Sequence, residues 1–197
     1  MNKKYSLSEL VQLLSLANDL QKIHLDLGCG NRKRIGYIGV DAVKLEGVDI
    51  VCNLEEGFPF EDNIIDGIYS RFLFEHIANT IFLFQELYRI CKNGAIIEFK
   101  VPYYQSVTQY KDPTHKAMIM PEMLRYFSDD KWYGSDYGIK VTFRIIGVHY
   151  EYLRPCNILI SKKLFFLWPI TYPFLLFARR FFWNVVHSVT IEMEVVK

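Results

Sequence analysis

Two glycines separated by one residue follow a short apolar segment near the start of the chain. The segment is Ile23–Leu27, and Gly28 and Gly30 come directly after it. Because glycine has no side chain and tolerates positive φ, a turn built this way lets a ligand lie against the main chain. Asp26 places a carboxylate at the rim of the turn. The pattern is typical of the nucleotide-facing corner of an open α/β sheet, and a plain tight turn after a strand is the alternative.

Polar residues also stand where the next predicted strands end. Asp41 ends the second strand, Asn53 follows the third, and Ser70 with Arg71 ends the fourth. In an open parallel sheet, ligands bind at the carboxyl ends of the strands. The Asp41 carboxylate can accept both hydroxyls of a ribose, and the Asn53 amide oxygen can accept from an adenine amino group. Taken alone, Asp41 could equally be a solvated strand end, but the four strand ends together predict a nucleoside-containing ligand.

Apolar periodicity and turn residues predict the elements that position these side chains. The predicted strands are 23–27, 37–41, 48–52, 65–70, 95–101, 140–153 and 189–196, and the predicted helices are 6–20, 80–91 and 121–127. Residues 103–120 are predicted to form a long polar loop. Ser6 and Glu9 fit a capping box on the first helix, while Thr80 and residues 92–94 are predicted to cap the second.

The order of these elements predicts the fold class. Only a short turn separates the first two strands, so the helix that usually joins parallel strands must be a single turn or absent there. The last two strands alternate apolar and polar residues, as an antiparallel pair does. The sequence therefore predicts an α/β fold: a Rossmann-like, doubly wound, mostly parallel seven-stranded sheet with an antiparallel edge strand.

Composition excludes several classes of protein. A chain of 197 residues, 51% of them hydrophobic, has the length of one α/β domain with a sizeable core. The formal net charge of +1 gives no electrostatic footprint for nucleic acid. The four cysteines lie too far apart for a zinc site or a disulfide framework. Their spacing therefore predicts no metal centre. No apolar signal segment follows Lys3 and Lys4, so we expect a cytoplasmic protein.

Together these motifs resemble the class I S-adenosylmethionine-dependent methyltransferases of the type 11, small-molecule kind. The resemblance covers about residues 23–101, roughly half of the chain. It is carried by residues 25–31, 39–41, 49–54, 58–60, 66–70, 74–77, 86–90 and 92–95. Each piece alone is weak, but the set in this order is specific.

The resemblance implies an enzyme that uses S-adenosyl-L-methionine. The cofactor-binding residues that it implies are Asp26, Gly28, Cys29, Gly30, Asp41, Asn53, Leu54, Ser70 and Arg71. Asp41 would hold the ribose, Asn53 and Leu54 would border the adenine, and the others would face the methionine end. NAD is disfavoured, because a dinucleotide fold needs a third glycine where Lys33 stands and a full helix to receive a pyrophosphate.

The predicted loop 103–120 supplies the candidates for work on the acceptor. His115 is the first choice for a general base, with a loop-shaping histidine as the alternative, and Tyr104 is the candidate for orienting the acceptor. His76 is interpreted as a packing residue. Two departures from the family pattern stand out: Asn53 replaces a frequent Asp, and Phe72 replaces a frequent His. The second keeps open a cofactor-binding protein without catalysis, in a regulatory or assembly role.

An aromatic segment near the C-terminus fits none of these roles. Residues 164–178 are apolar and are flanked by Lys162, Lys163, Arg179 and Arg180. The segment is too short to span a membrane, and its two prolines are predicted to break it. Contact of residues 164–183 with a membrane, a lid over a lipidic acceptor, a dimer contact and packing on the sheet are the alternatives. We expect a monomer or a homodimer, and the charge balance disfavours a nucleic-acid acceptor.

These expectations define one methyltransferase domain over residues 1–197. Its expected parts are an N-terminal helix in 1–22, a cofactor-binding core in 23–101, an acceptor loop with a short helix in 102–139, and a terminal strand pair in 140–197 with an aromatic insertion at 162–186. The acceptor is expected to be a small or membrane-associated molecule that receives the methyl group on O, N or C.

Overall fold

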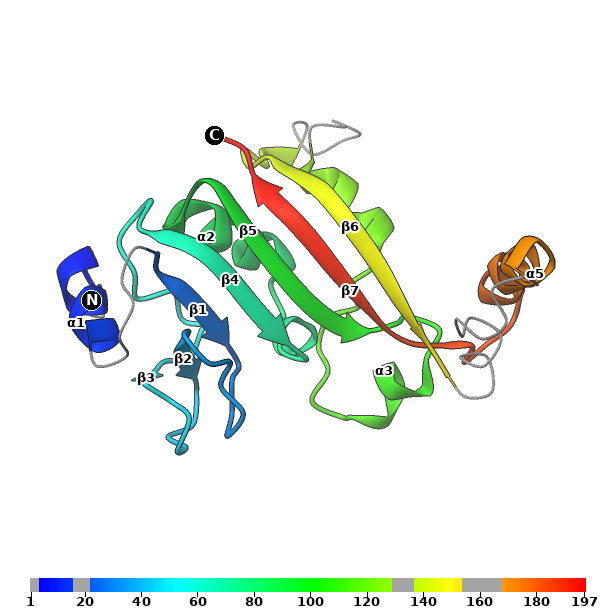
Figure 1. Cartoon of the computed structure of the whole chain (residues 1–197), viewed down its shortest axis with the longest axis horizontal. Helices are drawn as coiled ribbons and strands as arrows, with labels where there is room; N and C mark the ends of the chain where they lie inside the picture. Colours follow the sequence, from blue (N-terminus) through cyan, green and yellow to red (C-terminus); the bar gives the residue numbers. More distant parts are fainter. Residues whose placement is uncertain (1–3, 16–21, 129–136, 154–167) are drawn as a thin grey trace.

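Seven strands form one sheet in the order β3-β2-β1-β4-β5-β7-β6 (Figure 1). The computed structural model describes residues 4–15, 22–128, 137–153 and 168–197. The strands are β1 (His24–Leu27), β2 (Ile38–Asp41), β3 (Ile50–Val51), β4 (Ile65–Arg71), β5 (Cys91–Pro102), β6 (Phe143–Tyr152) and β7 (Val186–Val195). β1 to β5 are parallel to one another, and β7 is antiparallel to both β5 and β6. The predicted fold class is confirmed, with the reversed strand one position in from the edge.

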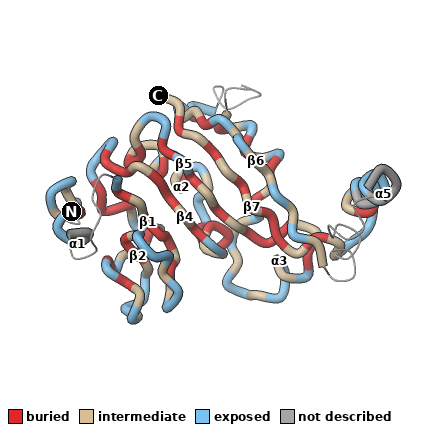
Figure 2. Tube along the Cα trace, in the orientation of Figure 1, coloured by how far each residue is buried: buried red, intermediate tan, exposed pale blue. Residues whose placement is uncertain are grey.

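The helices are short, and most of the core lies along the central strands (Figure 2). They are α1 (Leu7–Ser15), α2 (Thr80–Ile90), α3 (Val107–Lys111) and α5 (Trp168–Phe181), with 3₁₀ turns η1 (Phe74–His76) and η2 (Pro121–Phe127). α2 lies behind β4 and β5 in Figure 1. Its Phe84 packs on Phe99 of β5 and on Phe127 of η2, with ring centroids 6.2 and 4.5 Å apart. No helix among the described residues is long and apolar enough to cross a membrane.

Helix ends follow the sequence in one place and depart from it in another. The capping box of α1 forms, because the Ser6 amide donates to the Glu9 carboxylate at 2.9 Å. The last five residues of the predicted helix, 16–20, lie outside the described residues. The cap of α2 is Asn79 rather than Thr80, since the Asn79 side chain accepts from the Phe82 amide. The predicted C-terminal cap at 92–94 is wrong, because β5 already begins at Cys91.

Two other predictions about local structure are wrong. The loop after β5 contains helix α3, which Ser106 caps by accepting a hydrogen bond from the Thr108 amide. The prolines do not break the aromatic segment, because α5 runs continuously through Pro173. A proline ring costs a helix one internal hydrogen bond, and this helix evidently forms despite that loss. The absence of a helix between β1 and β2, in contrast, agrees with the prediction.

Candidate active site

The turn after β1 is held open by its two glycines. Gly28 and Gly30 have φ of 69° and 53°, a region that residues with side chains rarely adopt. The Gly28 amide donates to the Val40 carbonyl of β2 at 2.8 Å, which ties the turn to the sheet. A Cβ on Gly28 would lie 2.8 Å from Cβ of Leu73, whereas a Cβ on Gly30 would meet no atom within 4 Å. The main chain at Gly30 therefore borders open space.

Asp41, at the end of β2, is fixed by backbone amides. Its Oδ2 accepts from the Gly30 amide at 2.9 Å, and its Oδ1 accepts from the Val43 amide at 3.1 Å. The carboxylate thereby joins the ends of β1 and β2. Each carboxylate oxygen retains a further lone pair, so the group can also accept hydrogen bonds from a ligand.

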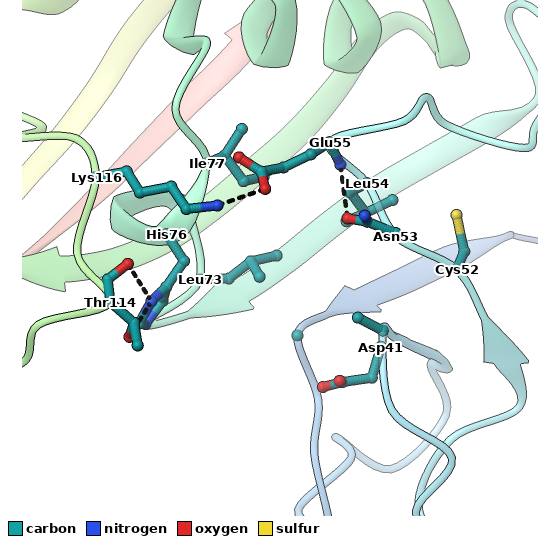
Figure 3. Close-up of a pocket in the computed structure, with 12 residues that line it drawn as sticks. Asp41, Cys52, Asn53, Leu54, Glu55, Leu73, His76, Ile77, Thr114 and Lys116 are labelled. Carbon is teal, nitrogen blue, oxygen red and sulfur yellow. Dashed lines mark hydrogen bonds and ion pairs between the residues drawn. The ribbon is translucent and has the colours of Figure 1, made fainter.

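A first cavity of about 340 Å³ lies beside Asp41 (Figure 3). Of the predicted cofactor residues, it is lined by Gly28, Asp41, Asn53 and Leu54. The Asn53 Oδ1 accepts from the Glu55 amide at 3.2 Å, which orients the side chain. Figure 3 shows the ion pair of Lys116 and Glu55, 2.5 Å long, across the cavity from Asp41. These two residues are not recognisable as neighbours in the sequence, where 61 positions separate them.

A second cavity of about 380 Å³ lies against the glycine turn. The predicted residues that line it are Asp26, Gly28, Cys29, Gly30 and Arg71. Asp26 is buried, and burial raises the pKa of its carboxyl, although its Oδ2 accepts from the Arg34 amide at 2.7 Å. Burial also raises the pKa of the Cys29 thiol to about 11, so this thiol stays neutral.

Ser70 is placed differently from the other predicted cofactor residues. Its side chain is 1% exposed, and its hydroxyl donates to the Leu27 carbonyl at 3.0 Å. Ser70 lines none of the three cavities described here. Its hydroxyl therefore fastens β4 to β1 beneath the site, and the neighbouring Arg71 is the side chain that reaches the second cavity.

A third cavity of about 290 Å³ contains His115. Phe72 lines both the second and the third cavity, His76 lines the first and the third, and Gly28 lines the first and the second. The three cavities therefore share lining residues, two of which lie in the segment that follows β4. Phe72, one of these two, has φ of 58°, so the backbone is strained there.

The surroundings of His115 determine which ring nitrogen is available. Its Nδ1 lies 2.8 Å from the Gln109 carbonyl, which can only accept, so Nδ1 carries a proton. Nε2 lies 4.0 Å from Oε1 of Glu75 and 3.8 Å from Oδ2 of Asp112. The ring of His76 is 4.8 Å away. In the neutral histidine, Nε2 is therefore the nitrogen that can accept a proton.

Glu75 is a buried carboxyl group beside His115. It is 1% exposed, and neither carboxylate oxygen has a hydrogen-bond partner among the described residues. Burial raises the pKa of the Glu75 carboxyl to about 7. Its backbone carbonyl accepts from the amides of Lys116 and Ala117 at 2.8 and 2.9 Å, which fixes the loop carrying His115. The sequence showed Glu75 only as a member of the family motif, with no sign that it is buried.

The Glu75→Gln substitution should stabilise the protein in a pH-dependent way. Below about pH 4.5 the carboxyl is neutral in both the folded and the unfolded chain, so the substitution should change little. As pH rises from about 4.5 to the folded pKa of about 7, the unfolded chain ionises while the folded chain keeps its proton, and above this range the folded chain must bury the charge. The wild type then loses about 3 kcal/mol relative to the variant. Urea unfolding at pH 4.5 and pH 8 measures the difference, and a pH-independent difference would contradict the raised pKa.

Tyr104 lies away from these cavities. Its ring packs against Tyr103, with centroids 4.6 Å apart, and it lines none of the three. Its carbonyl accepts from the Tyr110 hydroxyl at 2.9 Å. The structure thus brings His115 to the site but does not bring Tyr104 there.

A mostly parallel sheet with cavities at the carboxyl ends of its strands is typical of Rossmann-like, cofactor-binding proteins. A family model described as a methyltransferase domain matches residues 1–160. The chain belongs to this methyltransferase family. No curated protein matches the sequence.

Solved structures share the fold at low sequence identity. The YcgJ protein from Bacillus subtilis matches with a TM-score of 0.57 and 15% identity, over 95% of this chain and 98% of that one. A SAM-dependent methyltransferase from Archaeoglobus fulgidus matches at 0.56 and 21%, over 95% and 92%. Phosphoethanolamine N-methyltransferase 2 from Haemonchus contortus, in complex with S-adenosyl-L-methionine, matches at 0.51 and 16%, over 96% of this chain and 53% of that one.

Proposed function

We propose that this chain transfers the methyl group of S-adenosyl-L-methionine to an oxygen, nitrogen or carbon atom of a small or membrane-associated acceptor. The observation that carries the proposal is that three neighbouring cavities share Gly28, Phe72 and His76 among their lining residues. Two of them suit the two ends of the cofactor, and the third suits the acceptor. Family membership and the cofactor named for two of the structural neighbours support this reading.

The residues present fit this cofactor. The main chain at Gly30 borders open space that a side chain would fill, which suits a ligand lying against the turn. The Asp41 carboxylate is fixed at the first cavity, where it can accept both ribose hydroxyls. Asn53 and Leu54 line the same cavity and would border the adenine. No helix begins between β1 and β2, so this turn lacks the helix N-terminus that would receive a pyrophosphate.

Asp26 and Arg71 are proposed to hold the methionine end in the second cavity. They line it together with Gly28, Cys29 and Gly30. A carboxylate and a guanidinium are complementary to the ammonium and the carboxylate of an amino acid. The neutral Cys29 thiol adds no charge between them.

The reaction needs little chemistry from the protein. When bound, the cofactor supplies a methyl group on a positively charged sulfur, which leaves as a neutral thioether. The protein mainly aligns the acceptor, and alignment can supply roughly 7–11 kcal/mol of the barrier. For an acceptor that must lose a proton, Nε2 of His115 is proposed to accept it in the third cavity. Glu75 acts as a positioning residue, because its carbonyl holds the loop that carries His115.

Calorimetry and a product assay test the proposal. The chain should bind S-adenosyl-L-methionine and S-adenosylhomocysteine competitively and should not bind NAD. Incubation with a panel of small alcohols, phenols and amines, and separately with lipid vesicles, should release S-adenosylhomocysteine in at least one case. No binding would overturn the proposal. Binding without product from any acceptor would favour a cofactor-binding protein that has lost catalysis.

A further inference from the structure

Helix α5 stands apart from the sheet, beyond the ends of β6 and β7 (Figure 1). Six large apolar side chains of the helix and the two residues after it are 37 to 55% exposed. These residues, which we call the apolar patch of α5, are Tyr172, Phe174, Leu176, Phe177, Phe182 and Trp183. Among the described side chains of the helix, only Ala178 is buried (Figure 2). A concentration of this kind marks an interaction surface.

The sequence that contains the patch carries charge of one sign. No Asp or Glu occurs between Glu151 and Glu192, whereas five basic residues do: Arg154, Lys162, Lys163, Arg179 and Arg180. The whole chain has a net charge of only +1, so this stretch of sequence is markedly more positive than the rest. Arg180 is exposed, and the Arg179 guanidinium lies 4.1 Å from the centroid of the Tyr150 ring. Exposed aromatic side chains with basic neighbours are complementary to an anionic lipid surface.

The patch is joined to the third cavity by short contacts. The ring of Trp183 lies 5.3 Å from that of Tyr110 in α3. The Asn184 side chain accepts from the Val107 amide at 3.2 Å, at the first residue of α3. α3 in turn contributes Thr108 and Lys111 to the lining of the cavity that holds His115. A surface bound by the patch would therefore lie next to the acceptor site.

We propose that the apolar patch of α5 docks the protein on an anionic lipid membrane. A second copy of this chain is the competing occupant, but a symmetric contact would bring two positively charged patches together, which is unfavourable. The consequence for the substrate class rests on the proposed function: the acceptor is presented at the membrane surface, as a lipid headgroup is. Docking itself requires neither cofactor nor acceptor.

Co-sedimentation of the full chain with vesicles tests the proposal. The protein should pellet with vesicles that contain phosphatidylglycerol, and far less with vesicles of phosphatidylcholine alone or at high salt. The Phe174→Ser, Phe177→Ser double variant should bind about tenfold or more weakly, because two apolar side chains lose their burial. Arg180→Gln should bind about fivefold more weakly. Tyr137→Ser is the matched control, because Tyr137 is 73% exposed but lies outside the patch.

The outcomes separate the docking from the proposed function. Calorimetry with S-adenosyl-L-methionine on each variant shows whether its fold is intact, since the patch contributes no residue to the two cofactor cavities. Wild-type protein that stays in the supernatant with both vesicle types overturns the docking, whatever the cofactor result. A dimer by light scattering that the double variant converts to monomer, without vesicle binding, identifies the patch as a subunit interface and also overturns it.

Discussion

Replacing Asp41 by alanine should weaken S-adenosyl-L-methionine binding by about 100-fold or more. The Asp41 carboxylate is held at the rim of the first cavity by the amides of Gly30 and Val43. In the proposed complex it accepts both ribose hydroxyls, and hydrogen bonds to a charged group are worth roughly 1.5–3 kcal/mol each. Calorimetric titration of the variant measures the loss. An unchanged dissociation constant would reject the ribose role.

Asp49 provides the matched control for this experiment. Like Asp41, it accepts from a backbone amide: its Oδ2 lies 2.7 Å from the amide of Gly39 in β2. It lines none of the three cavities and pairs with Lys33 instead. Asp49→Ala should therefore leave cofactor affinity nearly unchanged in the folded protein. If both variants lose affinity equally, the effect of Asp41 is on the backbone and not on the ligand. Asp41→Asn, which keeps one acceptor oxygen, should show an intermediate loss.

The His115→Ala variant should lose turnover without losing cofactor affinity. A well-placed general base contributes about 100- to 10,000-fold to the rate, and His115 lies in the third cavity, outside the two assigned to the cofactor. The measurements are S-adenosylhomocysteine release with an acceptor from the panel and calorimetric titration of the cofactor. Equal losses in both quantities would make His115 structural, as would no loss in either.

His149 is the control histidine for this experiment. Its side chain is 68% exposed and lies on β6, where it approaches Glu192 rather than a cavity. His149→Ala should change neither turnover nor affinity. The Glu75→Gln variant adds a second comparison, because it alters the neighbour of Nε2 while it keeps the backbone carbonyl that fixes the His115 loop.

The site residues whose positions are determined by the course of the backbone could be predicted from the sequence. Closely spaced glycines after a strand indicate a tight turn, and a carboxylate at the end of a parallel strand lies at the edge of the sheet where ligands bind. Gly30 and Asp41 were therefore expected at the cavities that they line. Ser70 and Tyr104 show the limit. Both are near the site in sequence, but side-chain direction in β4 and ring packing on Tyr103 decide what they touch. The contacts of these two side chains are not evident from the spacing of residues in the sequence.

The burial of Glu75 and the pairing of Lys116 with Glu55 could not be predicted either, because both depend on contacts between segments that are distant in the sequence. Glu75 is surrounded by segments far apart in the chain, so its unpartnered carboxyl cannot be read from its neighbours. Lys116 and Glu55 meet only because the loop after α3 folds back over the end of β3. For α5 the sequence-based prediction relied too strongly on a local preference. The two prolines were expected to prevent a helix there, but α5 continues through Pro173.

The position of β7 between β5 and β6 constrains the order in which the chain can assemble. Among the strands that the structure describes, β6 pairs only with β7, which follows it in the sequence. β6 is therefore synthesised before the strand with which it pairs. Until β7 has been synthesised, the edge of β6 that will pair with β7 stays unpaired. Unpaired strand edges are prone to association with other chains.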